Sequence, residues 1–261
     1  MRRGGVVRLF DLHKRSLIAL SRPLLSIIIP AHNEERRLPR TLEQVFAFLK
    51  QESYAAEVVI VENGSSDRTL EIAQGFAGKH ANLHVVRCAE SGKGLAVRLG
   101  MLEAKGEYRF MCDADLSMPI EEVKRFFPPA LTDFDIAIGS REVKGARRFN
   151  EPLHRHLGGR LINLMIRLLI LPPLQDTQCG FKCFRAPIAD DLFRRQTLDD
   201  WSFDIELLFV AYRRGYRVVE IPVDWYYREE SKVSAVRDAL RMIQDIFRIR
   251  ANARGGVYDA D

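Results

Sequence analysis

The sequence predicts an α/β fold built around a mainly parallel β-sheet. Short apolar runs rich in β-branched residues, such as residues 24–30 and 57–61, have the composition of strands buried on both faces. Longer segments with apolar residues at helical spacing separate these runs. The two patterns alternate every ~25–30 residues, and helices that connect successive strands place those strands parallel to one another.

Five strands are expected before residue 141. They cover residues 24–30, 57–61, 83–86, 108–112 and 134–140. The intervening helices cover residues 36–50, 67–79, 91–104 and 119–127. The first helix places Leu38, Leu42 and Val45 on one face, and Asp67 is a suitable N-terminal cap for the second.

The alternation ends near residue 141, and two amphipathic segments stand out in the remainder. Residues 153–171 and 235–250 have apolar faces flanked by basic residues. Such helices suit a membrane surface, and ordinary packing on the sheet is the alternative interpretation. We divide the chain into a basic N-terminal segment (1–23), an α/β domain (24–230) and an amphipathic basic helix with a tail (231–261).

Composition narrows the class of protein. The 261-residue chain is 47% hydrophobic and 29% charged, as is typical of a soluble globular protein. Its net charge of +5 is too small to indicate a nucleic-acid polymer as partner. No apolar run reaches the ~18 residues of a membrane-spanning helix, and the N-terminus lacks the apolar core of a signal peptide. Four cysteines without zinc-type spacing indicate reduced thiols and a cytoplasmic protein.

Polar clusters directly follow three of the expected strands. They read AHNEE, ENGSSD and DADLS. Parallel sheets bind ligands outside the carboxyl ends of their strands, so these clusters mark a candidate site. In the third cluster, Asp113 and Asp115 point to the same side if the backbone is extended. Such a pair either binds a divalent cation, with water and phosphate as further ligands, or forms a solvated loop end.

Six motifs follow one another in the order and spacing of a known family. They are SIIIPAHNEE, VVIVENGSSDRT, GKGLAVRLGM, DADLS, GSR and DTQCGFKCF. The set resembles inverting glycosyltransferases of family 2 with the GT-A fold, over about residues 24–250. It is most similar to dolichyl-phosphate glucosyltransferases and dolichyl-phosphate mannose synthases, and DTQCGFK with WSFDIELL resembles the glucosyltransferase version.

The resemblance implies a nucleotide-sugar site at the strand ends. The matching positions are Pro30, Glu34 and Glu62 for the nucleoside, and Gly64 and Ser65 for the turn beneath it. Lys93 matches a position near the uracil or the diphosphate, with a surface lysine as the alternative. The family usually has Asp-Asp where this chain has Glu62-Asn63, so the contact to the base stays open.

The resemblance also implies a metal site and an acceptor-phosphate site. Asp113 and Asp115 match the pair that binds Mg²⁺ or Mn²⁺, and Ser117 stands where mannose synthases have a glutamine. Arg141 and Arg155 match arginines that bind the acceptor phosphate, for which a guanidinium group is well suited.

Other residues have roles that the sequence leaves open. Arg228 and Lys232 match a flexible loop that closes over the diphosphate in the family, or they belong to a plain surface segment. Asp204 orients sugar hydroxyls, acts as a base or anchors a helix start. Further polar residues in the same motifs are Asp176, Lys182 and Glu206, and Gln178 and Cys179 are interpreted as structural.

The implied reaction is attack of a polyprenyl phosphate on the anomeric carbon of UDP-glucose, with inversion and with Mg²⁺ or Mn²⁺ as cofactor. The implied setting is the cytoplasmic face of a membrane, with the protein bound peripherally. Three alternatives stay open: transfer of mannose from GDP-mannose, transfer to a soluble acceptor, and binding of a nucleotide sugar without transfer. The oligomeric state is not predicted.

Overall fold

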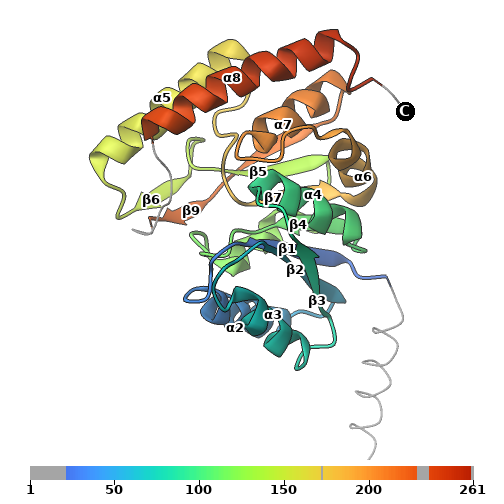
Figure 1. The fold of residues 1–261 in the computed structure, drawn as a ribbon. Helices are drawn as coiled ribbons and strands as arrows, with labels where there is room; N and C mark the ends of the chain where they lie inside the picture. The colour runs from blue at the N-terminus through green and yellow to red at the C-terminus, as the bar shows by residue number, and fades with distance from the viewer. Residues whose placement is uncertain (1–21, 172, 228–234, 260–261) are drawn as a thin grey trace, which may run out of the picture.

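A seven-stranded sheet forms the centre of the protein (Figure 1). The computed structural model describes residues 22–171, 173–227 and 235–259, without the side chains of residues 154, 155 and 235–239. The strands of this sheet are β1 (Leu25–Ala31), β2 (Ala56–Asn63), β3 (Leu83–Cys88), β4 (Tyr108–Met111), β5 (Ile136–Ser140), β7 (Lys182–Arg185) and β8 (Val218–Pro222). Their order is β3-β2-β1-β4-β7-β5-β8.

All neighbouring strands in this sheet run parallel except at β7, which is antiparallel to both β4 and β5. A separate parallel pair consists of β6 (Arg147–Phe149) and β9 (Asp224–Tyr226). The predicted α/β fold with a mainly parallel sheet is therefore confirmed.

Helices cover both faces of the sheet (Figure 1). On one face lie α2 (Leu38–Leu49), α3 (Thr69–Ala77) and the 3₁₀ helix η1 (Ile120–Arg125). On the other face lie α4 (Lys93–Glu103), α6 (Ala186–Arg195) and α7 (Phe203–Arg213), with α5 (Leu153–Leu169) and α8 (Ala235–Arg254) beyond them. The inner side of α8 contributes Met242, Ile246 and Ile249 to the core on this face.

Strand β1 shows why the first strands are so apolar. Leu25, Ile27 and Ile29 pack into the core beneath α2 and α3, whereas Ile28 packs into the core beneath α4. Side chains alternate between the two faces of a strand, and both faces of this strand are covered. A nearly continuous apolar run, in which the buried Ser26 is the polar exception, is the consequence.

The differences from the expected elements are concentrated after β4. Residues 119–127 were expected to form an α-helix, but they form the shorter 3₁₀ helix η1. The helix expected over residues 235–250 continues to Arg254. Strand β7 was not expected from the sequence, because it is only four residues long and both of its pairing partners are distant in sequence.

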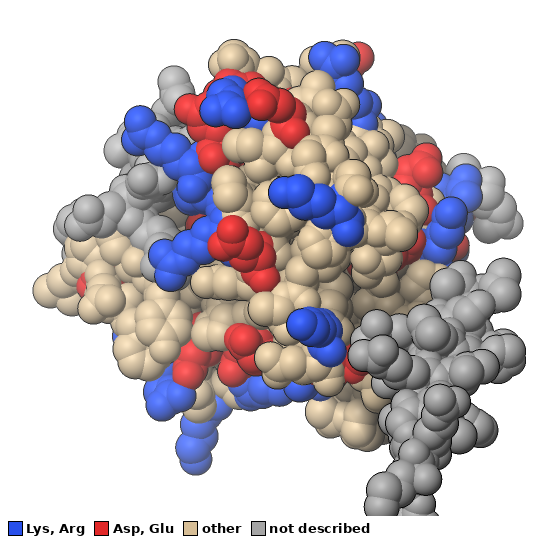
Figure 2. All heavy atoms as spheres, turned by 90° about the horizontal axis from the view of Figure 1, so that it is seen from below, with Lys and Arg blue, Asp and Glu red and all other residues tan. Residues whose placement is uncertain are grey.

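The face that carries α2 and α3 has mixed charge. Figure 2 shows this face from below, and its basic and acidic side chains are interspersed. Among the described residues on this face, no field of one sign develops of the kind that binds nucleic-acid polymers.

Candidate active site

The carboxyl ends of β1, β2 and β4 meet at one edge of the sheet. The register pairs Ala31 of β1 with Glu62 of β2, and Ile28 of β1 with Met111 of β4. The three polar clusters that follow these strands are thus brought to the same edge, as the sequence predicted.

Loops after β1 and β2 hold each other through backbone amides and short polar side chains. The Asn33 amide donates to Oγ of Ser65 over 3.0 Å, and the Ser66 amide donates to Oδ1 of Asn33 over 2.8 Å. The Glu34 amide donates to Oγ1 of Thr69 over 2.7 Å. These bonds hold the loop after β1, which follows Pro30 and Ala31, against the loop that contains Ser65.

Two of the predicted nucleoside residues are already engaged within the protein. Oε1 of the buried Glu62 accepts the Ser65 amide over 2.5 Å. Oε2 of Glu62 lies 3.8 Å from the Arg87 guanidinium group. The Glu34 carboxylate accepts two hydrogen bonds from Arg37, over 2.6 and 2.8 Å.

Gly64, which follows the last residue of β2, makes the turn that leads to Ser65. Its φ of 60° lies in the left-handed region, and a Cβ there would stand 3.2 Å from the carbonyl oxygen of Ala89. Glycine therefore suits this position for both conformational and steric reasons.

Asn63 links this edge to the start of α4. Its side-chain amide donates to the Gly92 carbonyl over 2.6 Å, and its Oδ1 accepts the Gly92 amide over 3.1 Å. A carboxylate at this position would lose the donated bond. Asn63, which departs from the family pattern, therefore holds Gly92 in place. In this way it also positions Lys93, the next residue in the chain.

Lys93 extends from the start of α4 to the carboxylate pair after β4. Its Nζ lies 2.7 Å from Oδ1 of Asp113. Burial disfavours the charged form of Lys93, but the charges of Asp113, Asp204 and Asp115 outweigh this and raise the pKa of Lys93. The lysine that the sequence left between a binding role and a surface role thus lies partly buried against the carboxylate pair.

Asp113 and Asp115 are partly exposed at this edge. Burial opposes ionisation of Asp113, yet Lys93, Lys182 and Arg141 together lower its pKa. Burial and then the charge of Asp113 raise the pKa of Asp115. The Ser117 amide donates to Oδ1 of Asp115 over 2.9 Å.

Gly180 makes room for this pair. A Cβ at position 180 would stand only 2.0 Å from Oδ2 of Asp113. The glycine of the DTQCGFK motif therefore lets the chain before β7 approach the Asp113 carboxylate, a role that the sequence analysis did not identify.

The carboxylate pair fits a hard divalent cation. Burial and the negative charge of Asp113 disfavour ionisation of Asp115. A divalent cation beside the pair would stabilise the ionised form of both carboxylates. In the described part of the chain, no group of three or more His, Cys, Asp or Glu side chains forms a fuller metal cage. Water and a bound diphosphate would have to complete the coordination, as Mg²⁺ and Mn²⁺ commonly accept.

A buried ion pair lies behind the carboxylates. Lys182 of β7 has its Nζ 2.9 Å from Oδ1 of Asp204, in the first turn of α7, and donates to the Cys179 carbonyl over 2.5 Å. Burial raises the pKa of Asp204, although Lys182 and Lys93 counteract the rise. Asp204 therefore neutralises a buried lysine and stands at a helix start, which was one of its predicted roles.

Glu206 has a structural role. Its carboxylate accepts hydrogen bonds from the amides of Thr197 and Leu198, over 2.9 and 2.8 Å, and from the Tyr258 hydroxyl over 2.7 Å. This fully buried side chain joins the loop before α7 to the end of the chain.

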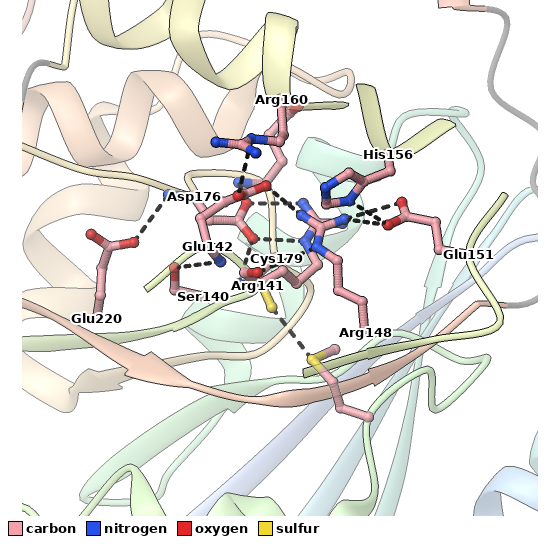
Figure 3. A network of polar contacts seen from close by, with 12 residues as sticks. Ser140, Arg141, Glu142, Arg148, Glu151, His156, Arg160, Asp176, Cys179 and Glu220 are labelled. Carbon is pink, nitrogen blue, oxygen red and sulfur yellow. Dashed lines mark hydrogen bonds and ion pairs between the residues drawn. The ribbon is translucent and has the colours of Figure 1, made fainter. Parts of the chain in front are cut away.

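Arg141, at the end of β5, is held by the buried carboxylate of Asp176 (Figure 3). Its Nε and Nη2 donate to the two oxygens of Asp176 over 2.7 and 2.9 Å, and its amide donates to Oδ2 over 3.0 Å. Although burial alone would raise it, the pKa of Asp176 is lowered to about 2 by Arg141. The described contacts leave Nη1 of Arg141 without a protein partner.

A second arginine, Arg148, lies beside Arg141 (Figure 3). It donates to the Arg141 carbonyl over 3.3 Å and to Glu142 and Glu151 over 2.5 and 2.8 Å. Both guanidinium groups lie over the Trp225 ring, with their Cζ atoms 5.6 and 5.9 Å from its centroid. Neither Arg148 nor Trp225 was expected from the sequence to lie at this site.

Three predicted site residues cannot be placed in the same way. Arg228 and Lys232 lie outside the described residues, and so does the side chain of Arg155, although its backbone belongs to α5.

This fold is that of GT-A glycosyltransferases. Glucosyl-3-phosphoglycerate synthase from Mycobacterium tuberculosis, solved with Mn²⁺, UDP-glucose and phosphoglyceric acid, aligns with a TM-score of 0.63. The alignment covers 98% of this chain and 86% of that protein at 15% sequence identity, so it establishes the fold alone.

The family follows from the sequence. Residues 26–193 match the model of the family described as glycosyl transferase family 2, and the chain belongs to that family. Dolichyl-phosphate beta-glucosyltransferase of Drosophila melanogaster is 35% identical, over 86% of this chain and 74% of the relative. The protein of the same name from Homo sapiens is 29% identical, over 90% of this chain and 77% of the relative.

Proposed function

We propose that this protein transfers glucose from UDP-glucose to a dolichyl or other polyprenyl phosphate, with inversion at the anomeric carbon. The observation that carries the proposal is the similarity, over 86–90% of the chain, to relatives named dolichyl-phosphate beta-glucosyltransferase. The polar edge of the sheet supplies residues for each part of this reaction.

The donor nucleotide binds along the ends of β1 and β2. Pro30, Glu34, Glu62, Gly64 and Ser65 form the nucleoside side of the site, and Glu62 is able to accept the imide N–H of uracil. Lys93 exchanges its contact with Asp113 for a contact with the diphosphate, where its charge offsets that of the phosphates.

Asp113 and Asp115 would hold Mg²⁺ or Mn²⁺ beside the diphosphate. A bound divalent cation supplies electrostatic stabilisation of the charge that develops on the leaving UDP. The protein's own contribution is to hold the two carboxylates at the edge of the sheet, with Gly180 leaving space around Asp113.

The acceptor phosphate binds at Arg141, together with Arg155. Asp176 fixes the orientation of Arg141 through Nε and Nη2, which leaves Nη1 to donate to a phosphate oxygen. A phosphate monoester has a second pKa near ~6 and is largely anionic at neutral pH. The reaction therefore needs no strong general base, and the ion pair of Asp204 with Lys182 is compatible with it.

The lipid is reached through α5 and α8, which lie side by side at the outer edge of the molecule (Figure 1). The strongly exposed leucines of α5 share one side of the helix: Leu153, Leu157, Leu161, Leu164 and Leu168. On α8, Leu240 and Phe247 are each 60% exposed. Exposed arginines accompany them, including Arg160 and Arg241.

An apolar stripe with basic neighbours is suited to an anionic membrane surface. No helix in the described ranges combines the length and the apolar character needed to cross a bilayer. We further propose that residues 24–230 are the catalytic domain, that residues 1–23 and 231–261 assist membrane binding, and that the protein acts at the cytoplasmic face. Four free cysteines accord with a reducing compartment.

Membrane binding is tested by sedimentation with vesicles of anionic lipid. A Leu161→Asp/Leu168→Asp variant removes two leucines that are 68% and 75% exposed, so folding is retained. Vesicle affinity is expected to fall about 100-fold because two leucine insertions are lost. Gln74→Asp, at an exposed position of α3 on the other side of the sheet, is the control. Equal vesicle affinity of the double variant and the wild type would exclude this surface.

The activity is tested with labelled UDP-glucose or labelled GDP-mannose, a short polyprenyl phosphate and Mg²⁺, followed by extraction into organic solvent. Label from UDP-glucose is expected in the organic phase. If only label from GDP-mannose reached the organic phase, the proposed sugar would be wrong. If transfer occurred only to water-soluble phosphates, the proposed acceptor would be wrong. Donor binding without any transfer would contradict the proposed function.

A further inference from the structure

We propose that the indole ring of Trp201 is the platform on which the hexose of the donor lies, so that Trp201 is a positioning residue of the transfer reaction. This inference rests on the proposed function and adds the part of the site that contacts the sugar. The family motifs above assigned no role to Trp201.

The position of Trp201 relative to the charged groups carries the inference. Nζ of Lys93 lies 5.0 Å from the centroid of the Trp201 ring and 2.7 Å from Oδ1 of Asp113. The aromatic ring, the lysine and the carboxylate therefore form one continuous contact at the edge of the sheet. In a nucleotide sugar, the hexose is joined to the phosphate that Lys93 and the metal-binding pair would hold, so it extends from that point.

Trp201 remains 52% exposed at this point. A single exposed aromatic residue needs no explanation by itself. Here, however, the exposed ring lies against the ammonium group of Lys93, which in turn contacts the Asp113 carboxylate, and a pyranose has the matching chemistry. Its C–H face packs on an aromatic ring while its hydroxyls bond to charged groups.

The segment that carries Trp201 is rigidly attached to α4. The Leu95 amide donates to the Asp199 carbonyl over 3.0 Å, and Arg98 pairs with Asp199 over 3.1 Å. A Cβ at Gly92 would stand 2.6 Å from the Asp199 carbonyl oxygen, and a Cβ at Gly94 would stand 2.8 Å from that of Leu198. These two glycines allow the loop and the helix start to touch.

From the other side, Glu206 fixes the same loop by accepting the amides of Thr197 and Leu198. The ring of Trp201 is thus carried by a loop that α4 and Glu206 hold at residues 197–199, directly before the start of α7 at Phe203. A preorganised ring loses little conformational entropy when the sugar binds.

The chain contains two tryptophans, which makes a direct test possible. In a Trp225→Phe background, Trp201 is the only tryptophan, and its fluorescence is recorded during titration with UDP or with UDP-glucose in the presence of Mg²⁺. UDP-glucose is expected to change the emission of Trp201 clearly more than UDP does, because only the sugar covers the ring. Identical changes with the two ligands would overturn the proposal.

Affinity supplies the second readout. In Trp201→Ala, binding of UDP-glucose is expected to weaken about tenfold relative to the wild type, with UDP binding changed much less. Trp201→Phe is expected to recover most of the difference because it keeps an aromatic face. If Trp201 only shielded Lys93, both ligands would weaken equally in Trp201→Ala, and this result would overturn the inference.

The two proposals fail in distinguishable ways. If the wild type transfers mannose from GDP-mannose, the sugar named in the proposed function is wrong. The role of Trp201 is then tested by comparing the binding of GDP-mannose with that of GDP. A wild type that binds no nucleotide sugar contradicts both proposals. A wild type that transfers glucose, with an unchanged ratio of UDP-glucose to UDP affinity in Trp201→Ala, contradicts the role of Trp201 alone.

Discussion

The proposed donor side and the proposed acceptor side of this site are held together by different interactions. On the donor side, loops after β1 and β2 are joined mainly by backbone amides that donate to short polar side chains, such as Asn33 and Ser65. On the acceptor side, a buried ion pair fixes the functional group, with Asp176 holding Arg141.

The difference follows from the fold of each side. Parallel strands that end together bring their loops into contact directly, so short side chains suffice. The acceptor side joins the end of β5 to the segment before β7, which are far apart in sequence and are connected by the charged side chains of Arg141 and Asp176. We therefore expect substitutions on the donor side to lower mainly the transfer rate. Substitutions on the acceptor side are expected to lower mainly the free energy of unfolding.

The largest expected effect is on activity at the donor side. Asp115→Asn should reduce glucose transfer by roughly a thousandfold, because a neutral amide cannot replace a carboxylate as ligand of a hard cation. Transfer rates at saturating Mg²⁺ or Mn²⁺ measure the effect, and Asp133→Asn, on an exposed surface, is the matched control. A nearly unchanged rate in Asp115→Asn would remove this residue from the metal site.

Next in size is a loss of stability at the acceptor side. Asp176→Asn leaves the guanidinium group of Arg141 without its buried counter-charge, and the free energy of unfolding should fall by about 3 kcal/mol. Urea unfolding measures this loss. Asp133→Asn breaks an exposed pair with Arg217 and should leave the urea midpoint unchanged. Equal midpoints for the two variants would contradict the contrast between the two sides.

The same ion pair should make stability depend on pH. The pKa of Asp176 is about 2 in the folded protein against an ordinary value of 3.8. Its contribution is therefore complete above the ordinary value and is lost as the pH falls towards 2, a change of roughly 2 kcal/mol. The stability difference between the wild type and Asp176→Asn should shrink between pH 5 and pH 2. A difference that stays constant over this range would rule out the lowered pKa.

The smallest expected effect returns to the donor side. Asn63→Asp introduces the residue usual in the family but loses the hydrogen bond donated to the Gly92 carbonyl, a cost of about 1 kcal/mol. Because Gly92 precedes Lys93, KM for the donor should rise severalfold with little change in KM for the acceptor. A change confined to the acceptor KM would show that Asn63 does not act through Lys93.

Much of the geometry of the proposed donor side was predictable because its signals are local. The apolar runs of β1 and β2 and the helical spacing of α2 each lie within one short segment, and the parallel connection then brings Glu62 and Asp113 to one edge. Gly180 and Trp225 escaped prediction because their roles depend on contacts with Asp113 and Arg141, which are distant in the sequence.

By itself, the sequence determined the α/β class, the mainly parallel sheet, the family and the Asp113/Asp115 pair, because periodicity and motif spacing are properties of the chain. Only the tertiary structure decided that β7 enters the sheet antiparallel between β4 and β5, that Asp176 orients Arg141, and that Trp201 faces Lys93. These arrangements depend on long-range packing and on the pairing of buried charges, which no local pattern specifies.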